Sequence, residues 1–91
     1  MQLQYFATLR DITGRSEQPW SSNVETAGEL LLQLCSRYGP KFKRWVLEED
    51  GSLSQMCIIL VNGHDIRGLD GLATRLHQED SISLFPPLAG G

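Results

Sequence analysis

Apolar and polar side chains alternate at the start of the chain, as they do in a strand with one buried face. Leu3 and Tyr5 are separated by glutamines, and this period of two predicts a β-strand that ends near Ala7. Residues 10–14 then predict a turn, and Gln18–Ser22 predicts a returning strand. Because the proline within this second segment has no amide hydrogen to donate, the strand is expected at an edge of the sheet.

A helical period follows. Thr26 and Glu29 have the spacing of a capping box, in which the threonine hydroxyl accepts a hydrogen bond from the glutamate amide and the glutamate side chain reaches back. Five apolar residues then recur on one helical face: Leu30, Leu31, Leu34, Cys35 and Tyr38. Gly39-Pro40 is expected to end this helix.

The second half of the chain has three strand signals. Met56–Val61 is its most apolar segment and predicts a strand that is apolar on both faces. Asn62-Gly63 is typical of a tight hairpin turn, which would bring His64–Arg67 back alongside that strand. Ser81–Phe85 alternates strictly and predicts the last strand.

The intervening segment, residues 41–54, has a mixed pattern. Phe42, Trp45 and Val46 can pack one face of a short helical turn, which indicates a packed connection; a partner-binding insertion is the alternative. The order β-β-α-β-β-β with one long helix predicts an α+β protein with a β-grasp (ubiquitin-like) fold. In that fold a mixed sheet holds one main helix on one face.

The composition favours one small domain, residues 1–85, followed by a projecting tail, residues 86–91. Ninety-one residues with 41% hydrophobic content leave room for a single core. A net charge of −3, without a basic run, argues against a nucleic-acid partner. The longest apolar run is too short to span a membrane, and the N-terminus lacks the features of a signal peptide, so a cytoplasmic protein without membrane contact is expected.

Few side chains offer chemistry of their own. His64 and His77 lie apart in sequence without a Cys/His cluster, so no metal site is expected. The glycines do not form a phosphate-binding motif, so no nucleotide or other cofactor should bind this chain. Cys35 and Cys57 lack a C-x-x-C spacing and are expected to be reduced, buried thiols.

The C-terminus is the most informative segment. It reads Phe85-Pro86-Pro87-Leu88-Ala89-Gly90-Gly91. The two final glycines bury no side chain, but without a Cβ they can enter a narrow cleft. Pro86-Pro87 restricts the backbone and favours an extended stem. The terminal carboxylate is ionised and unreactive at neutral pH, so chemistry at Gly91 requires activation, most economically by ATP.

This tail resembles that of the small subunit of molybdopterin synthase, the MoaD family, among the ubiquitin-like sulfur carriers that include ThiS and the Urm-type modifiers. The opening segment Tyr5–Arg10 with Gly14, and the segments Asn62–Arg67 and Leu69–Leu72, are similar to longer members. The resemblance covers nearly the whole chain, and the tail is its most specific part.

The family's arrangement has consequences for the sheet faces, because it makes the first and last strands parallel neighbours. Four residues are then expected to face the helix: Leu3, Tyr5, Ile82 and Leu84. Phe6 and Phe85 would lie together on the other face, as a docking surface unless residues 41–54 cover it. Arg10 and Arg67 could contact a partner or pair with neighbouring aspartates.

The resemblance implies a sulfur carrier without activity of its own. An E1-like adenylating enzyme of the MoeB type would use ATP to activate Gly91, which would then carry sulfur as a thiocarboxylate. Sulfur would be delivered to the pterin precursor in the large subunit of molybdopterin synthase, of the MoaE type. Seven residues would bind these partners: Phe6, Phe85, Pro86, Pro87, Leu88, Ala89 and Gly90.

Three alternatives stay open. The thiocarboxylate could serve cysteine synthesis, thiamine synthesis or tRNA thiolation. Gly91 could instead form an isopeptide with a lysine, as in a ubiquitin-like protein modifier. The β-grasp surface could also act as a plain interaction module whose tail is never activated.

Overall fold

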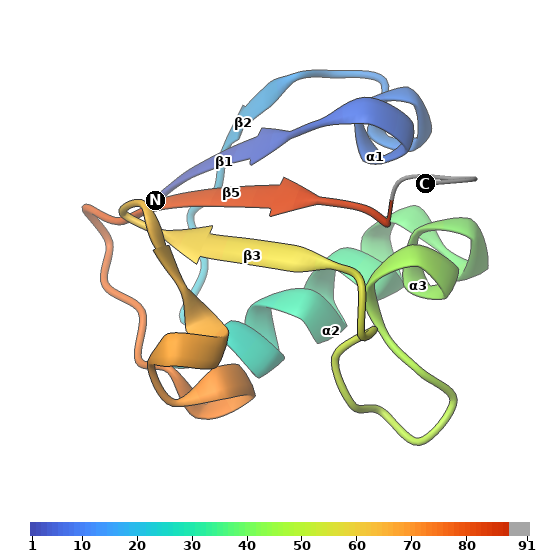
Figure 1. Ribbon diagram of the computed structural model, residues 1–91. Coiled ribbons are helices and arrows are strands. Elements are labelled where there is room, and N and C mark those ends of the chain that lie inside the picture. Colours follow the sequence, from blue (N-terminus) through green and yellow to red (C-terminus); the bar gives the residue numbers. More distant parts are fainter. Residues whose placement is uncertain (88–91) are drawn as a thin grey trace.

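A five-stranded mixed sheet lies at the centre of the protein, and the computed structural model describes residues 1–87. The strands are β1 (Gln2–Tyr5), β2 (Glu17–Pro19), β3 (Ile58–Val61), β4 (His64–Asp65) and β5 (Ser81–Phe85). They lie in the order β2-β1-β5-β3-β4, so the last strand of the chain is in the middle of the sheet (Figure 1). β1 and β5 are parallel, whereas the other neighbouring strands are antiparallel.

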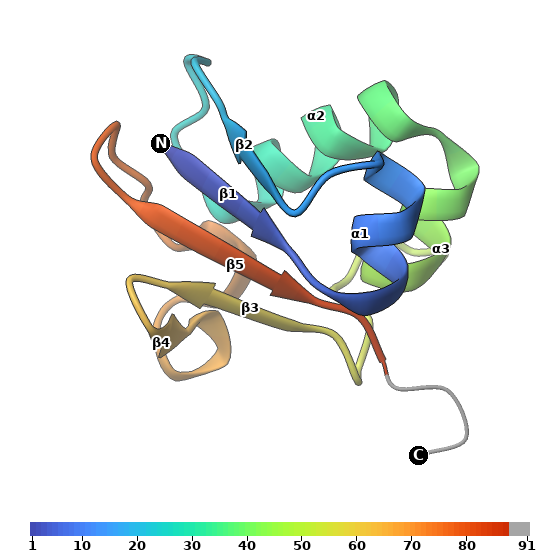
Figure 2. The same ribbon diagram turned by 90° about the horizontal axis from the view of Figure 1, so that it is seen from above.

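Helices pack on one side of this sheet. They are α1 (Ala7–Thr13), α2 (Ala27–Tyr38) and α3 (Pro40–Val46), and two 3₁₀ turns, η1 (Ile66–Gly68) and η2 (Gly71–Ala73), follow β4. The longest helix, α2, crosses the sheet, and α3 continues at its end (Figures 1 and 2). This is the predicted β-grasp fold, and the edge position expected for the proline-containing strand β2 is confirmed.

The core lies between the sheet and α2. The inward strand residues are almost completely buried, as predicted: Leu3, Tyr5, Ile82 and Leu84. From the helix side, Leu30, Leu31 and Leu34 fill the facing space, while Cys35 and Tyr38 are partly buried at the rim. Tyr5 and Tyr38 both donate hydroxyl hydrogen bonds to Oε1 of Gln18, at 2.7 and 2.6 Å, which satisfies the buried polar atoms beside the edge strand.

The predicted capping box is present with a shift of one residue. The Glu29 amide donates to Oγ1 of Thr26 at 3.2 Å, but the Glu29 carboxylate accepts from the amide of Glu25 at 2.7 Å, one residue before the cap. The helix ends as expected, because Gly39 has φ 85° and turns the chain directly into α3 at Pro40. At the start of α2, one amide in the first turn and one amide before the cap are thus satisfied by side chains of the same segment.

Residues 7–13 correct the sequence prediction, because they form helix α1 instead of the end of a strand and a turn. β1 already ends at Tyr5. Leu9 is completely buried and Ile12 partly so, at the i, i+3 spacing of one helical face. Seven residues are too few for a stable isolated helix, so this tertiary packing is what holds them helical.

The predicted hairpin is present but shorter. Asn62 and Gly63 have φ 52° and 85°, the left-handed values of a type I′ turn. β3 begins at Ile58 instead of Met56, and its partner β4 is limited to two residues. The chain then enters η1, in which Ile66 is fully buried.

The segment 41–54 is a packed connection, as interpreted from its pattern. Phe42 and Val46 are fully buried on α3, and Trp45 is partly buried. Phe42 packs edge-on against Tyr5, with ring centroids 6.3 Å apart, so it belongs to the core on the helix side of the sheet. The open face of the sheet is therefore not covered by this helix.

Candidate functional site at the base of the C-terminal tail

Phe6 and Phe85 stack on each other at the end of the parallel pair β1 and β5. Their ring centroids are 4.2 Å apart and the ring planes are inclined by 9°. The Phe6 amide donates to the carbonyl of Leu84 at 3.2 Å, which fixes the two chains at this point. Both rings are half-buried, so each offers an edge to solvent beside the first residue of the tail. The structure thus brings the two phenylalanines together, and their role in partner binding stays a prediction.

The antiparallel neighbour β3 extends this apolar surface. Ile58 lies opposite Phe85 in the ladder and is 43% exposed, and Met56, just before the strand, is 67% exposed. Towards the other end, Leu60 pairs with Ser83, whose hydroxyl donates to Oε1 of Gln4 at 3.1 Å. The open face is therefore apolar where the tail begins, and further along it becomes polar on β1 and β5, at Gln4 and Ser83.

The backbone beside Phe6 is strained. Ala7 has φ 52°, a left-handed value that a side chain with a Cβ adopts at a cost of about 1 kcal/mol. This residue turns the chain from β1 into α1 immediately after Phe6. The strain accompanies the change of direction that leaves the Phe6 ring over Phe85.

The first two residues of the tail are packed against the domain. Pro86 is buried and Pro87 is half-buried, so the first residues of the stem are packed against the protein. β5 ends beside the loop that leads into β3 (Figure 2). Leu88, Ala89, Gly90 and Gly91 lie outside the described residues, and the roles predicted for them stay predictions.

Arg67 has a structural role that the sequence did not indicate. Its guanidinium donates to the carbonyl oxygens of Ser54 (2.6 Å), Gln55 (3.1 Å) and Cys57, which form the turn before β3. The Asp65 carboxylate contacts the Arg67 amide at 2.9 Å instead of its guanidinium. The expected side-chain pair with Asp65 is therefore wrong, and a contact of Arg67 with a partner stays a prediction. The guanidinium fixes the turn that presents Met56 and Ile58.

The two thiols are shielded. Cys57 is completely buried, and this burial raises the pKa of its thiol to about 12. Burial also raises the pKa of the partly exposed Cys35. Both thiols therefore stay protonated near pH 7, and neither is an activated nucleophile. Cys57 is buried as predicted, whereas Cys35 is only partly buried.

The described residues offer little for binding a metal or crossing a membrane. Within residues 1–87, no three His, Cys, Asp or Glu side chains gather as a metal ion would require, and His64 and His77 are exposed. In the same part of the chain, no helix has the length and apolar character needed to cross a bilayer.

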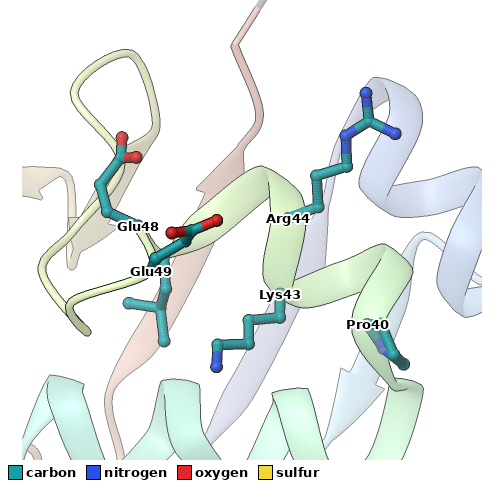
Figure 3. Close-up of a pocket in the computed structure, with 6 residues that line it drawn as sticks. Pro40, Lys43, Arg44, Glu48 and Glu49 are labelled. Carbon is teal, nitrogen blue, oxygen red and sulfur yellow. The ribbon is translucent and has the colours of Figure 1, made fainter.

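A hollow of about 530 Å³ lies beside α3, and the described site residues are not part of its lining (Figure 3). Its lining residues are Pro40, Lys43, Arg44, Leu47, Glu48 and Glu49. Charges of both signs line it, and it is open to solvent. The candidate site is consequently an exposed apolar surface with a tail beside it, and not an enclosed pocket.

Comparison with known proteins identifies the family. The model of the ThiS family matches residues 3–91, almost the entire sequence and its terminal glycine. The chain belongs to the ThiS family. Because the match runs to residue 91, the last residues are part of the family's pattern.

Two curated relatives have informative names. The small archaeal modifier protein 3 of Haloferax volcanii is 36% identical over 92 residues, which cover 100% of this chain and 98% of the relative. The sulfur carrier protein CysO of Mycobacterium tuberculosis is 32% identical over 84 residues, covering 91% of this chain and 89% of the relative. These ThiS-family relatives match nearly end to end.

Solved structures agree on the fold. The solution structure of the HVO 2177 protein from Haloferax volcanii superposes with a TM-score of 0.83 at 34% identity, covering 99% of this chain and 84% of that one. CysO in the crystal structure of the Amycolatopsis orientalis BexX/CysO complex gives a TM-score of 0.78 at 26% identity, covering 99% and 98%. The β-grasp architecture is thus shared over the whole domain.

Proposed function

We propose that the chain is a ubiquitin-like sulfur carrier whose reactive group is the Gly91 carboxylate. The observation that carries this proposal is the ThiS-family match through residue 91, which includes the terminal Gly-Gly of the sequence. The chain itself would not catalyse a reaction, because its thiols are neutral and its tail carboxylate is inert until activated.

The proposed chemistry takes place at the terminal carbonyl carbon. A carboxylate oxygen attacks the α-phosphorus of ATP in an E1-like adenylating enzyme, and pyrophosphate leaves. The terminal sulfur of a persulfide donor then attacks the carbonyl carbon and displaces AMP. A thiol reduces the resulting acyl disulfide and frees the thiocarboxylate on Gly91. ATP belongs to the enzyme in this scheme, and the carrier binds no cofactor.

The apolar surface would hold the carrier on that enzyme. Four residues form this surface around the root of the tail: the half-buried Phe6 and Phe85 and the exposed Ile58 and Met56. Pro86–Gly91 comprises six residues, which in an extended conformation reach roughly 20 Å. Docking at the surface could therefore place Gly91 in a catalytic cleft well away from it.

The relatives favour some acceptors over others. CysO is named a sulfur carrier protein, which supports sulfur transfer by this chain, with cysteine synthesis, thiamine synthesis and tRNA thiolation as the candidate routes. The role in molybdopterin synthase, with a MoaE-type large subunit, rests on the Phe-Pro-Pro-Leu-Ala-Gly-Gly tail and receives no added support from these relatives. We therefore place it behind the other routes.

Protein modification is a second candidate function. The relative of 36% identity from Haloferax volcanii is named a modifier protein. In this reaction a lysine amine attacks the activated Gly91 carbonyl and forms an isopeptide bond, with loss of the activating group. Both functions require activation of the same carboxylate and differ in the nucleophile that follows.

Intact-protein mass spectrometry tests the primary proposal. The chain is incubated with the E1-like enzyme of its organism, ATP and a persulfide donor, and its mass should rise by the difference between sulfur and oxygen. Deletion of Gly91 should abolish the shift while the fold is retained. The proposal fails if the Gly91-deleted chain still gains the mass or restores the pathway. Lysines that carry a Gly-Gly remnant in cell extracts would identify the modifier function.

A further inference from the structure

The charges of this acidic protein are separated in space. Residues 6–16 and 36–46 hold six of the eight basic side chains and one of the eleven acidic ones, a balance of +5. The rest of the chain carries −8, which together give the net charge of −3. The basic set, here called the basic end, consists of Arg10, Arg15, Arg37, Lys41, Lys43 and Arg44.

The fold brings these two distant segments to the same end of the molecule. Arg10 lies on α1, Arg37 on the last turn of α2 and Lys41 on α3. Arg15 precedes Ser16, whose carbonyl accepts from the amide at the end of β1. α1, α3 and the end of β5 lie at one end of the molecule in both views (Figures 1 and 2). The basic end therefore adjoins the root of the tail.

These cations are free to act on a partner. All six side chains are exposed. Among residues 1–87 the ion pair that forms joins Arg75 and Glu25, at 3.6 Å, elsewhere on the surface. Acidic side chains bound the basic end on one side, because Glu48 and Glu49 line the same hollow as Lys43 and Arg44 (Figure 3).

We propose that the basic end docks on an acidic surface of the protein that receives the tail, the activating enzyme first of all. Exposed charge of one sign beside a reactive group raises the rate of encounter with a surface of the opposite sign by ~10 to 1,000-fold at low salt. It also orients the carrier, because the opposite, acidic part of the chain is repelled. The apolar surface then makes the contacts that persist. This inference rests on the proposed function.

A protein surface fits the observations better than a nucleic acid. The basic end adjoins the root of a tail whose chemistry requires an enzyme cleft, and the remainder of the chain carries −8. That remainder would repel an extended polyanion but can point away from a local acidic surface. The partner is thus an enzyme with acidic residues at the rim of its tail-binding cleft.

Two single reversals with the same change in net charge test this assignment. Arg44→Glu lies in the basic end, whereas Arg75→Glu lies outside it, is also exposed, and gives up an exposed ion pair with Glu25. Adenylation of each variant by the E1-like enzyme of the same organism is measured from low to high salt. At low salt, Arg44→Glu should raise KM for the carrier ~3- to 10-fold with kcat unchanged, and Lys41→Glu/Arg44→Glu should raise it further.

The salt dependence completes the test. The wild-type KM should rise with salt, and the difference between wild type and Arg44→Glu should vanish once the charges are screened. Arg75→Glu should follow the wild type throughout. Equal effects of the two reversals, or a wild-type KM independent of salt, overturn the inference while leaving the carrier function intact. Failure of the wild type to be adenylated at any salt overturns the proposed function and this inference with it. If the chain instead binds tRNA in a salt-sensitive way and Arg44→Glu abolishes this binding, the partner of the basic end is a nucleic acid and not an acidic protein.

Discussion

The stacked pair Phe6 and Phe85 makes a quantitative prediction about stability. Exposure alone would predict almost no loss when either ring is removed. However, both rings are half-buried and stacked at 4.2 Å. Changing a fully buried phenylalanine to alanine lowers the free energy of unfolding by about 3–5 kcal/mol. For a half-buried ring we expect about half of this, about 1.5–2.5 kcal/mol for each single variant. The stack itself contributes about 0.5–1.5 kcal/mol of that loss, which is counted twice when the singles are added.

A double-mutant cycle measures this shared term. The free energies of unfolding of Phe6→Ala, Phe85→Ala and the double variant are determined by urea denaturation with circular dichroism. The double variant should be more stable than additivity predicts by about 0.5–1.5 kcal/mol. Phe42→Ala serves as the control for a fully buried ring and should cost about 3–5 kcal/mol. Additive losses would refute the stack, and single losses as large as that of Phe42→Ala would place both rings in the core and remove the docking surface.

Two further predictions concern the turn before β3 and the buried thiol. Arg67→Ala should speed amide hydrogen exchange at Gln55 to Ile58 more than elsewhere, because three hydrogen bonds to carbonyl oxygens are lost. Arg67→Lys should keep part of the protection that the arginine gives. An equal increase in exchange across the domain would contradict the role of Arg67 in fixing this turn. Burial raises the pKa of Cys57 from 9.0 to about 12. Because the thiol of the unfolded chain then ionises at lower pH than that of the folded chain, the free energy of unfolding should fall between pH 9 and 12. Cys57→Ala should lose that part of the pH dependence. Below pH 9 both states hold the thiol proton, and the variant's stability curve should run parallel to that of the wild type.

The sequence predicted the elements whose signals are local. The alternation in Leu3 and Tyr5, the Asn62-Gly63 turn and the helical stripe are set by the period of the backbone itself, so they indicated the sheet and α2 correctly. Helix α1 was not predicted, because its helical conformation depends on the burial of Leu9 against the rest of the fold. Propensity over seven residues is too weak to reveal such packing.

The candidate site was predictable only in part. The final glycines are read directly from the sequence, and strand alternation gives the faces of Phe6 and Phe85. That the two rings lie together followed from the family's parallel arrangement of the first and last strands, which the structure has. The contacts of Arg67 do not, because a guanidinium can reach any carbonyl within several ångströms and these lie 10 to 13 residues away in sequence. The basic end likewise requires the fold, since its two segments are separated by the whole of β2 and most of α2.

The central position of β5 affects how the protein bears mechanical load. A partner that grips the tail and pulls transmits force to β5, which is hydrogen-bonded to β1 on one side and β3 on the other. A pull along the strand loads the bonds of both ladders together in shear, whereas an edge strand such as β2 could be peeled away one bond at a time. The segment that is handed from one protein to another is thus attached to the strand that is hardest to extract. The tail can be drawn tightly into a cleft while the domain that carries it stays folded.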